Sequence, residues 1–420
     1  MKASDMTSMR SPLLALDDAL ARLLAHATPL RDTEAVSTFD ADGRVLAQAV
    51  VSQLQVPPQD NSAMDGYAVS CADLQQPGVL LAVSQRIPAG SSGQALQAGQ
   101  AARIFTGAPI PPGADAVVMQ EDCELFPATG ADAFPQLRIS GRVSPGQWIR
   151  RSGEDVRRGA EVLARGARLS AAGLGMAASV GMDRLQVVRK PRVALFSTGD
   201  ELVMPGDVAP ADMREGAIYN SNRYFLRAML LRLGCDVSDL GIVPDQRAAT
   251  VQALQDAAQA HDLILTSGGV SVGEEDHIRP AVESLGELDL WQIAVKPGKP
   301  FAYGRVNQAH FIGLPGNPVS SFVTFALLVR PFLLRLLGVP EVAPVVVGAR
   351  ADFDWPRADR RREFLRVRRN RAGGLDLFAN QSSGVLTSAV WGDGLVDNPP
   401  GQTIAKGDSV RFIALSDLLY

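Results

Sequence analysis

The segment that decides the fold, residues 262–276, reads DLILTSGGVSVGEED. Its short apolar run stops at Gly268 and Gly269, as expected of a buried strand that turns tightly at its end and lets the backbone approach a ligand. Small hydroxyl side chains surround these glycines: Thr266, Ser267 and Ser271. Hydroxyls beside exposed backbone N–H groups can cradle an anion.

Three consecutive acids, Glu274, Glu275 and Asp276, follow the glycines. Carboxylate oxygens at such a place can hold a divalent cation. An anion cradle beside a cation site indicates chemistry on a phosphate-bearing ligand. The alternative is a glycine-rich turn followed by solvated acids, and the segment alone does not decide between the two.

Size and composition exclude several classes of protein. The 420 residues predict two to four domains, and the net charge of −4 gives no field that attracts nucleic acid or an anionic membrane. The three cysteines, Cys71, Cys123 and Cys235, are far apart, which argues against a disulfide framework or structural zinc and fits a reducing compartment. No His-Glu-x-x-His pair is present, so a histidine-based zinc enzyme is not expected.

The chain shows neither a secretory signal nor a membrane span. Its first ten residues, MKASDMTSMR, lack an apolar core. The most apolar stretch, residues 322–337, contains Arg330, Pro331 and Arg335 and is too short to cross a bilayer. We therefore expect a buried helix there, no membrane or nucleic-acid partner, and a cytoplasmic location.

Lysine is rare in this chain. Of its 41 basic residues only five are lysines, and two of them, Lys296 and Lys299, stand in the segment KPGKP. Because arginine is used almost everywhere else, we interpret this pair as a place that requires compact ammonium groups. Chance clustering is the alternative.

The pattern along the chain changes character several times. Residues 11–28 predict a helix capped by Ser11 with Pro12 in its first turn, and residues 52–157 predict a mostly β domain. Residues 170–181 read as a packed helix capped by Ser170 rather than a dinucleotide-binding turn, since no strand precedes them. Short strands return after Pro340.

Between these regions, strands and helices alternate. Strands are predicted at residues 193–196, 236–241, 263–266, 290–295, 301–303 and 311–314. Helices are predicted at residues 225–233, ending at Gly234, and at residues 246–260, with Asp245 as the N-cap. This alternation predicts an α/β domain with a largely parallel sheet.

The unusual loops of this domain follow predicted strands, and ligands of open α/β sheets bind beyond the carboxyl ends of strands. These loops are residues 197–201, 266–276, 296–300 and 315–318. The last one leads into a helix whose positive dipole end, near Val319, would face the same edge. One sheet edge therefore gathers hydroxyls, glycines, two lysines and carboxylates. Glu201 and Asp245 each have an alternative role as a helix cap or exposed acid.

Seven motifs, in this order, resemble those of the molybdopterin molybdenumtransferases, the MoeA family that includes the E domain of gephyrin. They are DNSAMDGYAV (60–69), TGAPIPPGADAVV (106–118), RSGED (151–155), STGDEL (197–202), SGGVSVGEED (267–276), KPGKPF (296–301) and GLPGNPVS (313–320). The resemblance extends from about residue 11 to the C-terminus. Seven motifs in register are far more specific than any single one.

The resemblance implies an elongated subunit and a homodimer. The implied parts are an N-terminal helix on the α/β domain (1–28), a linking domain (29–51 and 158–184), a β-rich domain (52–157), an α/β molybdopterin-binding domain (185–338) and a C-terminal β domain (339–420). The implied reaction inserts molybdate into adenylated molybdopterin and releases AMP, with Mg²⁺ or another divalent cation. Contacts with other proteins of molybdenum cofactor biosynthesis are expected as well.

The resemblance also implies roles for individual residues. The catalytic residues would be Asp60, Thr106, Asp155, Asp245, Lys296 and Lys299. The substrate-binding residues would be Thr266, Ser267, Gly268, Gly269, Ser271, Gly316, Asn317, Pro318, Arg361 and Ser383. The metal ligands would be Glu201 and Asp276. Because Asp60 belongs to a different domain from the sheet edge, we expect its loop to complete the site from the partner subunit.

Two other functions compete with this one. The same α/β domain serves molybdopterin adenylyltransferases and competence-damage-type proteins, but the motifs within residues 52–157 have no place in a lone adenylyltransferase. The family also includes scaffolds that hold a partner peptide. A long disordered linker or a fused domain would favour scaffolding, and this chain has neither.

Overall fold

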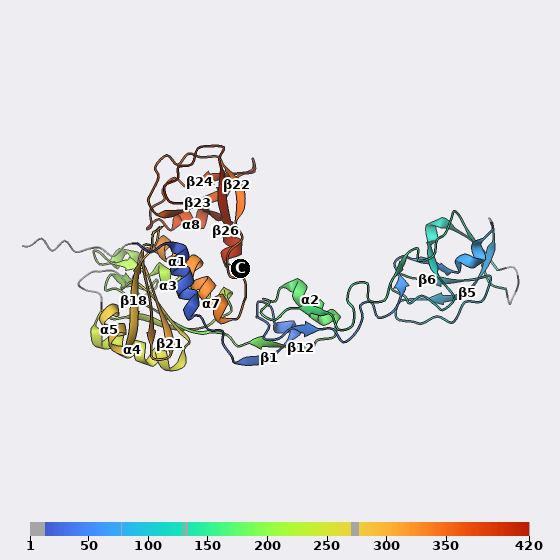
Figure 1. The fold of residues 1–420 in the computed structure, drawn as a ribbon, viewed down its shortest axis with the longest axis horizontal. Helices are drawn as coiled ribbons and strands as arrows, with labels where there is room; N and C mark the ends of the chain where they lie inside the picture. The colour runs from blue at the N-terminus through green and yellow to red at the C-terminus, as the bar shows by residue number, and fades with distance from the viewer. Residues whose placement is uncertain (1–12, 77, 129, 131–132, 270–276, 420) are drawn as a thin grey trace, which may run out of the picture.

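The computed structural model of the chain describes residues 13–76, 78–128, 130, 133–269 and 277–419. Ser11, Pro12, Ser271 and Asp276 therefore lie outside the described residues. The subunit is elongated, with the α/β and C-terminal domains together at one end and the β-rich domain at the other (Figure 1).

The α/β domain is built on a six-stranded sheet in the order β16-β13-β17-β21-β20-β18. The parallel strands are β13 (Arg192–Thr198), β16 (Asp236–Val243), β17 (Leu263–Ser267) and β21 (Ala309–Leu314). The antiparallel strand β20 (Pro300–Val306) joins β21 to β18 (Gly286–Gln292). The expected largely parallel sheet is confirmed, as a mixed sheet with two antiparallel pairings at one side.

One predicted strand is wrong. Residues 290–295 do not form a single strand, because β18 ends at Gln292 and the chain then enters β19 (Val295–Lys296). Strand β19 pairs with the C-terminal domain instead of the α/β sheet. The apolar pattern of residues 290–295 thus spans two strands in two different sheets.

Alternation along the strands explains why both faces of the sheet are covered. In β13, Val193 and Leu195 face the side occupied by α1 (Leu16–His26), α3 (Ser221–Arg232) and the helix Pro318–Leu336. Ala194 and Phe196 face the opposite side, occupied by α4 (Arg247–Ala260) and α5 (Ile278–Leu285). Burial on both faces is typical of parallel strands with crossover helices.

The apolar helix predicted over residues 322–337 is confirmed as a buried core helix. It runs from Pro318 to Leu336 as α6 (Pro318–Thr324), a π-helical turn (Phe325–Val329) and α7 (Arg330–Leu336). The expectation that this stretch is too short to cross a bilayer is wrong, because within the described residues the helix is long and apolar enough by length and composition. Its burial identifies it as a core helix, since 83% of its most apolar window lies inside the protein.

Helix boundaries differ from the predictions at two places. Helix α1 begins at Leu16, with Ala15 at its N-cap, so the predicted start at Ser11 and Pro12 is wrong. Helix α4 has Gln246, not Asp245, at its N-cap, and the Gln246 side chain forms no capping hydrogen bond. The predicted cap of α2 (Ala171–Ser179) is confirmed, since Ser170 Oγ accepts a hydrogen bond from the Gly173 N–H at 3.3 Å.

The middle of the subunit contains short antiparallel pairs around α2 (Figure 1). Strand β1 (Thr33–Ser37) pairs with β12 (Arg184–Val188), and β2 (Val50–Val51) pairs with β11 (Glu161–Leu163). Two chain segments therefore cross this region and connect the two ends of the molecule.

The β-rich domain holds a six-stranded sheet and a short strand pair. The sheet runs in the order β7 (Ala116–Met119), β4 (Gly66–Val69), β6 (Gln100–Ile104), β5 (Leu80–Ile87), β9 (Gln136–Ile139) and β8 (Cys123–Phe126). The pair is β3 (Asn61–Ser62) with β10 (Ile149–Arg150). The pair joins the Asp60 loop to the loop that carries the RSGED motif.

The C-terminal domain extends across the domain boundary. Its sheet contains β19 of the α/β domain followed by β23 (Arg362–Arg369), β24 (Gly374–Leu377), β22 (Val347–Ala351), β26 (Ser409–Ala414) and β25 (Gly394–Asn398). Phe364, Leu395 and Ile413 belong to the same apolar cluster as α1 and α7. The α/β and C-terminal domains therefore share a core.

Helix α1 should contribute to the stability of this shared core. Leu23 is fully buried in it, so Leu23→Ala is expected to lower the free energy of unfolding by about 2–5 kcal/mol through lost burial and a residual cavity. Leu231→Ala is the matched control, because Leu231 is 45% exposed and surface changes usually cost no more than about 0.5 kcal/mol. Urea unfolding measures both, and equal effects would contradict the packing of α1 described above.

Candidate functional site

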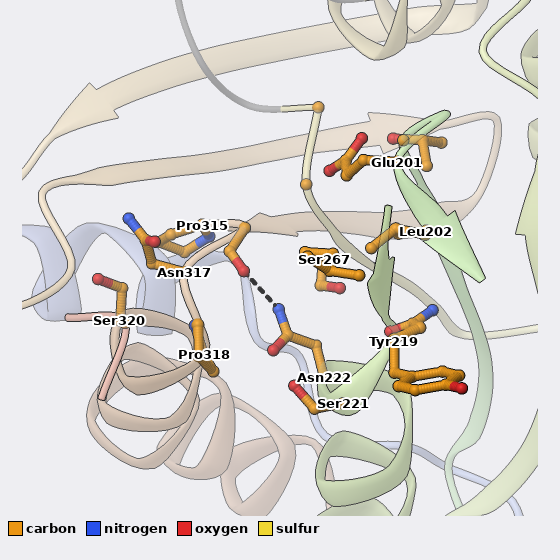
Figure 2. A pocket seen from close by; sticks show the side chains of 18 of the residues that line it. Glu201, Leu202, Tyr219, Ser221, Asn222, Ser267, Pro315, Asn317, Pro318 and Ser320 are labelled. Carbon is orange, nitrogen blue, oxygen red and sulfur yellow. Dashed lines mark hydrogen bonds between the residues drawn. The ribbon is translucent and has the colours of Figure 1, made fainter. Parts of the chain in front are cut away.

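A cavity of about 790 Å³ lies at the carboxyl edge of the α/β sheet. Figure 2 shows Glu201, Leu202 and Tyr219 on one side of it and Asn317, Pro318 and Ser320 on the other. The loops after β13, β17 and β21 all contribute to its wall, as the sequence predicted for this edge.

The strand order explains why a hollow forms here. The chain passes from β13 to β16 on one side of β13 and then to β17 on its other side. The connections on the two sides of β13 lead away from each other, which leaves a crevice beyond the carboxyl ends of β13 and β17. Thr198 and Gly199 line this crevice from β13, and Ser267 and Gly268 line it from β17.

Glycine is required at the end of β17. Gly268 and Gly269 have φ angles of +92° and +68°, which side-chain-bearing residues rarely adopt. A Cβ at Gly268 would also lie 2.9 Å from the carbonyl oxygen of Thr198, and one at Gly316 would lie 3.9 Å from the Cα of Gly268. Three loops thus approach one another with bare backbone. The Gly268 N–H donates a hydrogen bond to the Leu314 carbonyl at 3.0 Å, which ties the turn after β17 to the end of β21.

Two helix N-termini border the cavity. Helix α3 is capped by Asn220, whose Oδ1 accepts a hydrogen bond from the Arg223 N–H at 3.2 Å, and the helix Pro318–Leu336 has Asn317 at its N-cap. The two starts are tied together because Asn222 Nδ2 donates a hydrogen bond to the Gly316 carbonyl at 2.7 Å (Figure 2). Helix N-termini favour anions through their free N–H groups and the helix dipole.

Two of the predicted carboxylates, Glu201 and Asp245, line the cavity. Glu201 lies beyond β13 and Asp245 lies between β16 and α4. Within the described residues, no group of three or more His, Cys, Asp or Glu side chains is arranged to hold a metal ion. The predicted third acid, Asp276, lies outside those residues.

The predicted lysines lie at the junction with the C-terminal domain. Lys296 Nζ lies 3.0 Å from Glu363 Oε1 and 3.4 Å from Asp359 Oδ2. The Lys299 carbonyl accepts a hydrogen bond from the Ile293 N–H at 2.8 Å, and the next residue, Pro300, lines the cavity. The two lysines therefore have different surroundings.

The C-terminal domain supplies part of the cavity wall. Gly384 lines the cavity, and the carbonyl of the preceding Ser383 accepts a hydrogen bond from the Val319 N–H at 2.9 Å. Arg361 donates two side-chain hydrogen bonds to Asp359, at 2.9 and 2.8 Å. These bonds hold the pKa of Asp359 well below its usual range, with Lys296 adding to the effect.

Asp60 directly precedes β3 and Thr106 follows β6 of the β-rich domain, which lies at the other end of the subunit (Figure 1). Asp155 precedes Val156, which packs in the apolar cluster of the middle region around α2. Asp60 accepts a hydrogen bond from the Ser152 N–H at 2.8 Å, which lowers its pKa, and its ion pair with Arg151 lowers it further. Thr106 Oγ1 donates a hydrogen bond to Asp65 at 2.7 Å. Among the described residues that line the cavity, none comes from this domain, so these three stay predictions that require another subunit.

Some residues of the cavity wall were not predicted. Tyr219, Asn220, Ser221 and Asn222 line it, and the sequence signal was the Asn-Ser-Asn run that starts the helix at α3. Conversely, the predicted Thr266 is fully buried on β17 and is absent from the described lining. Its Oγ1 has no hydrogen-bond partner among the described residues.

Comparisons with known proteins agree over most of the chain. Residues 14–181 match the description "MoeA N-terminal region (domain I and II)", residues 194–335 match "Probable molybdopterin binding domain", and residues 348–415 match "MoeA C-terminal region (domain IV)". A molybdopterin molybdenumtransferase of Haemophilus influenzae is 40% identical over 356 residues, which are 84% of this chain and 85% of the relative. One of Nostoc is 35% identical over 401 residues, covering 92% and 89%.

The fold is also similar to solved structures. A crystal structure of the molybdopterin biosynthesis MoeA protein from Pyrococcus horikoshii has a TM-score of 0.82 at 28% identity, covering 96% of this chain and all of that chain. A second structure of a Pyrococcus MoeA protein has a TM-score of 0.75 at 30% identity, covering 96% and 99%.

The backbone conformation at the end of β17 can be tested directly. Gly268→Ala is expected to lower the free energy of unfolding by about 1–3 kcal/mol, because Gly268 has a φ of +92° and a Cβ would crowd Thr198. Gly175→Ala is the matched control in α2, where a Cβ meets open space and should stabilise by up to about 1 kcal/mol. Thermal unfolding of both variants measures this, and a neutral Gly268→Ala would contradict the described turn.

Proposed function

Since this chain belongs to the molybdopterin molybdenumtransferases, the MoeA family, and is thus a transferase of molybdenum cofactor biosynthesis, we propose that it inserts molybdate into adenylated molybdopterin and releases AMP. The observation that carries this proposal is the cavity at the carboxyl edge of the sheet, bordered by two helix N-termini and by the glycine turn after β17. Its volume of about 790 Å³ lies in the usual range for small-molecule sites.

The chemistry of the wall suits an adenylated pyrophosphate. Gly268 and Gly269 place bare backbone at the wall, and the starts of α3 and of the helix at Pro318 add positive dipole ends. Asparagine and serine side chains around them offer neutral hydrogen bonds to the remainder of the substrate. This combination holds the phosphates without placing a buried net charge on the protein.

The second substrate, molybdate, is itself an anion, so the two substrates repel each other. A positive group between them lowers that repulsion most when it is fixed in place before the reaction. Lys299 is the candidate, because it directly precedes Pro300 of the cavity wall. Release of AMP consumes one water at the pyrophosphate bond, and the Asp245 carboxylate on the wall is proposed to orient that water.

The described residues fit a divalent cation of the magnesium type. Mg²⁺ in proteins usually takes one or two carboxylates together with substrate phosphates and water, so it needs no cluster of three acids. Glu201 supplies a carboxylate on the wall and would hold the cation with Asp276. When bound, the cation would neutralise charge on the phosphate oxygens.

Of the alternatives, the adenylyltransferase-like function is disfavoured by the N-terminal match. The description that covers residues 14–181 includes the whole β-rich domain, which a lone α/β adenylyltransferase has no use for.

A cytoplasmic location and contacts with other proteins of the same biosynthesis belong to the proposal as well. They are supported by the family and by three cysteines that are free in the structure.

The proposed reaction predicts that purified protein with adenylated molybdopterin and Mg²⁺ releases AMP only when molybdate is added. Glu201→Gln should lower this release about 10- to 100-fold, because substitutions of residues around a metal ion typically lower metal affinity or activity by that factor. Glu215→Gln, the same change at an exposed residue outside the described lining, should leave it unchanged. AMP release by the wild type without molybdate, or none with it, would refute the proposal.

We further propose that the active form is a homodimer in which the β-rich domain of one subunit completes the cavity of the other. The β-rich domain, which carries the loops of Asp60 and Thr106, lies at the opposite end of the elongated subunit from the α/β domain that holds the cavity (Figure 1). Asp60 is already held by Ser152 and Arg151, so its carboxylate is ionised and oriented before any partner arrives.

A complementation experiment tests the shared site. Asp60→Ala and Glu201→Ala should each be inactive as homodimers. When equal amounts of the two variants are mixed and their subunits reassociate, the mixture should show about a quarter of wild-type activity. About half of the dimers are then hybrids, and each hybrid carries one intact site out of two. Full inactivity of a mixture that native mass spectrometry shows to contain hybrids would mean that each subunit builds its site alone.

A further inference from the structure

The two lysines of the KPGKP segment are not equivalent. Lys296 is engaged by two carboxylates of the C-terminal domain, Glu363 at 3.0 Å and Asp359 at 3.4 Å. Its ammonium also lies 5.9 Å from the ring centre of Trp355. In the part of the chain that the structure describes, the Lys299 side chain forms no ion pair or hydrogen bond.

Glu363 is the unusual partner in this network. Its side chain is only 1% exposed, and it accepts hydrogen bonds from Lys296 Nζ at 3.0 Å, Trp355 Nε1 at 2.8 Å and Asn398 Nδ2 at 3.3 Å. A carboxylate buried so deeply is tolerated only when a cation and hydrogen-bond donors compensate it. If Lys296 turned from Glu363 to a substrate, the buried carboxylate of Glu363 would lose its cation, which is costly.

The backbone reinforces this ion pair. Strands β19 and β23 pair in parallel, with Lys296 opposite Glu363. The Arg362 N–H donates a hydrogen bond to the Ala294 carbonyl at 2.9 Å. Side-chain and backbone contacts together hold residues 293–299 of the α/β domain against strand β23 of the C-terminal domain.

Residues 293–299 are followed by Pro300, which lines the cavity. The hydrogen bond from the Ile293 N–H to the Lys299 carbonyl closes the loop at 2.8 Å. Gly298, with a φ of +112°, packs so closely on the methyl group of Thr324 that a Cβ would collide with it. Ser320 of the same helix and Pro300 both line the cavity. Lys299 therefore stands between Gly298, which packs on that helix, and Pro300, which belongs to the wall.

We propose that Glu363 is a positioning residue for the transferase reaction. It neutralises and anchors Lys296, and the anchored loop in turn places Lys299 beside the cavity, where Lys299 alone of the pair acts on the oxyanion. This inference rests on the proposed function. It differs from the sequence-based prediction, in which Lys296 was a catalytic residue, because here Lys296 supports Lys299 and does not contact the substrate.

A double-mutant cycle on kcat tests the proposal. Glu363→Gln and Lys296→Met should each lower kcat roughly 10-fold, and the double variant should also be lowered roughly 10-fold, because residues that act as one unit are non-additive. The KM for molybdate should change less than about 3-fold in all three, whereas Lys299→Met should raise it about 10-fold or more. Glu283→Gln, the same change at the exposed Arg279–Glu283 pair, is the control.

A roughly 100-fold loss in the double variant would mean that Lys296 acts independently of Glu363 and would overturn the proposal. The proposal would also be overturned if Glu363→Gln kept the wild-type kcat while Lys296→Met lost most of it. If Glu363→Gln fails to fold, Trp355→Phe removes the indole donor to Glu363 and should give a smaller loss of about 3-fold that is again non-additive with Lys296→Met.

Hydrogen exchange followed by mass spectrometry gives a second readout that needs no turnover. Glu363→Gln should raise the exchange rate of residues 293–299 about 10-fold, because local opening becomes easier, and leave Gln100–Ile104 of the β-rich domain unchanged. Unchanged exchange at residues 293–299 would reject the positioning role whatever the enzyme catalyses. An inactive wild type with the expected exchange would reject the proposed function alone.

Discussion

The parallel register of β13, β16, β17 and β21 is the constraint on which the site depends. Because these strands run in the same direction, the loops after them meet at one edge of the sheet, although residues 198 and 316 are far apart in the chain. The order β16-β13-β17 then opens a crevice at that edge. Glycines at the ends of the strands keep the crevice lined with backbone rather than filled with side chains.

The C-terminal domain is a structural part of this edge. It shares an apolar core with α1 and α7, extends its sheet with β19, and contributes Gly384 to the cavity wall. The buried Glu363 of β23 is ion-paired with Lys296 of β19, which links this domain to residues 293–299. A cavity built in this way depends on two domains staying fixed relative to each other, which a shared core and a buried ion pair both favour.

Much of this arrangement was predictable from the sequence, because strand alternation, glycine turns and helix starts are local signals. The loops at residues 197–201, 267–269 and 315–318 were placed at one edge correctly. Asp245 was misassigned as a cap because Asp is a favoured cap residue, yet the helix begins one residue later than that role requires. Residues 290–295 were misread because strand propensity does not reveal that β19 belongs to another sheet.

Other features could not be predicted because they depend on residues distant in the chain. The difference between Lys296 and Lys299 is set by Glu363, 67 positions away from Lys296, and nothing in the KPGKP segment itself distinguishes the two lysines. Likewise, the loops around Asp60 and Thr106 show their motif in the sequence, but neither residue is among the described residues that line the cavity of the α/β domain.

The most direct test of the central claim is a crystal structure of the protein with adenylated molybdopterin and an oxyanion bound. The account predicts the pyrophosphate at Gly268, Gly269 and Gly316, against the starts of α3 and of the helix at Pro318, with the oxyanion nearer to Lys299 than to Lys296. Ligand bound on another face of the α/β domain, with this cavity empty, would contradict it.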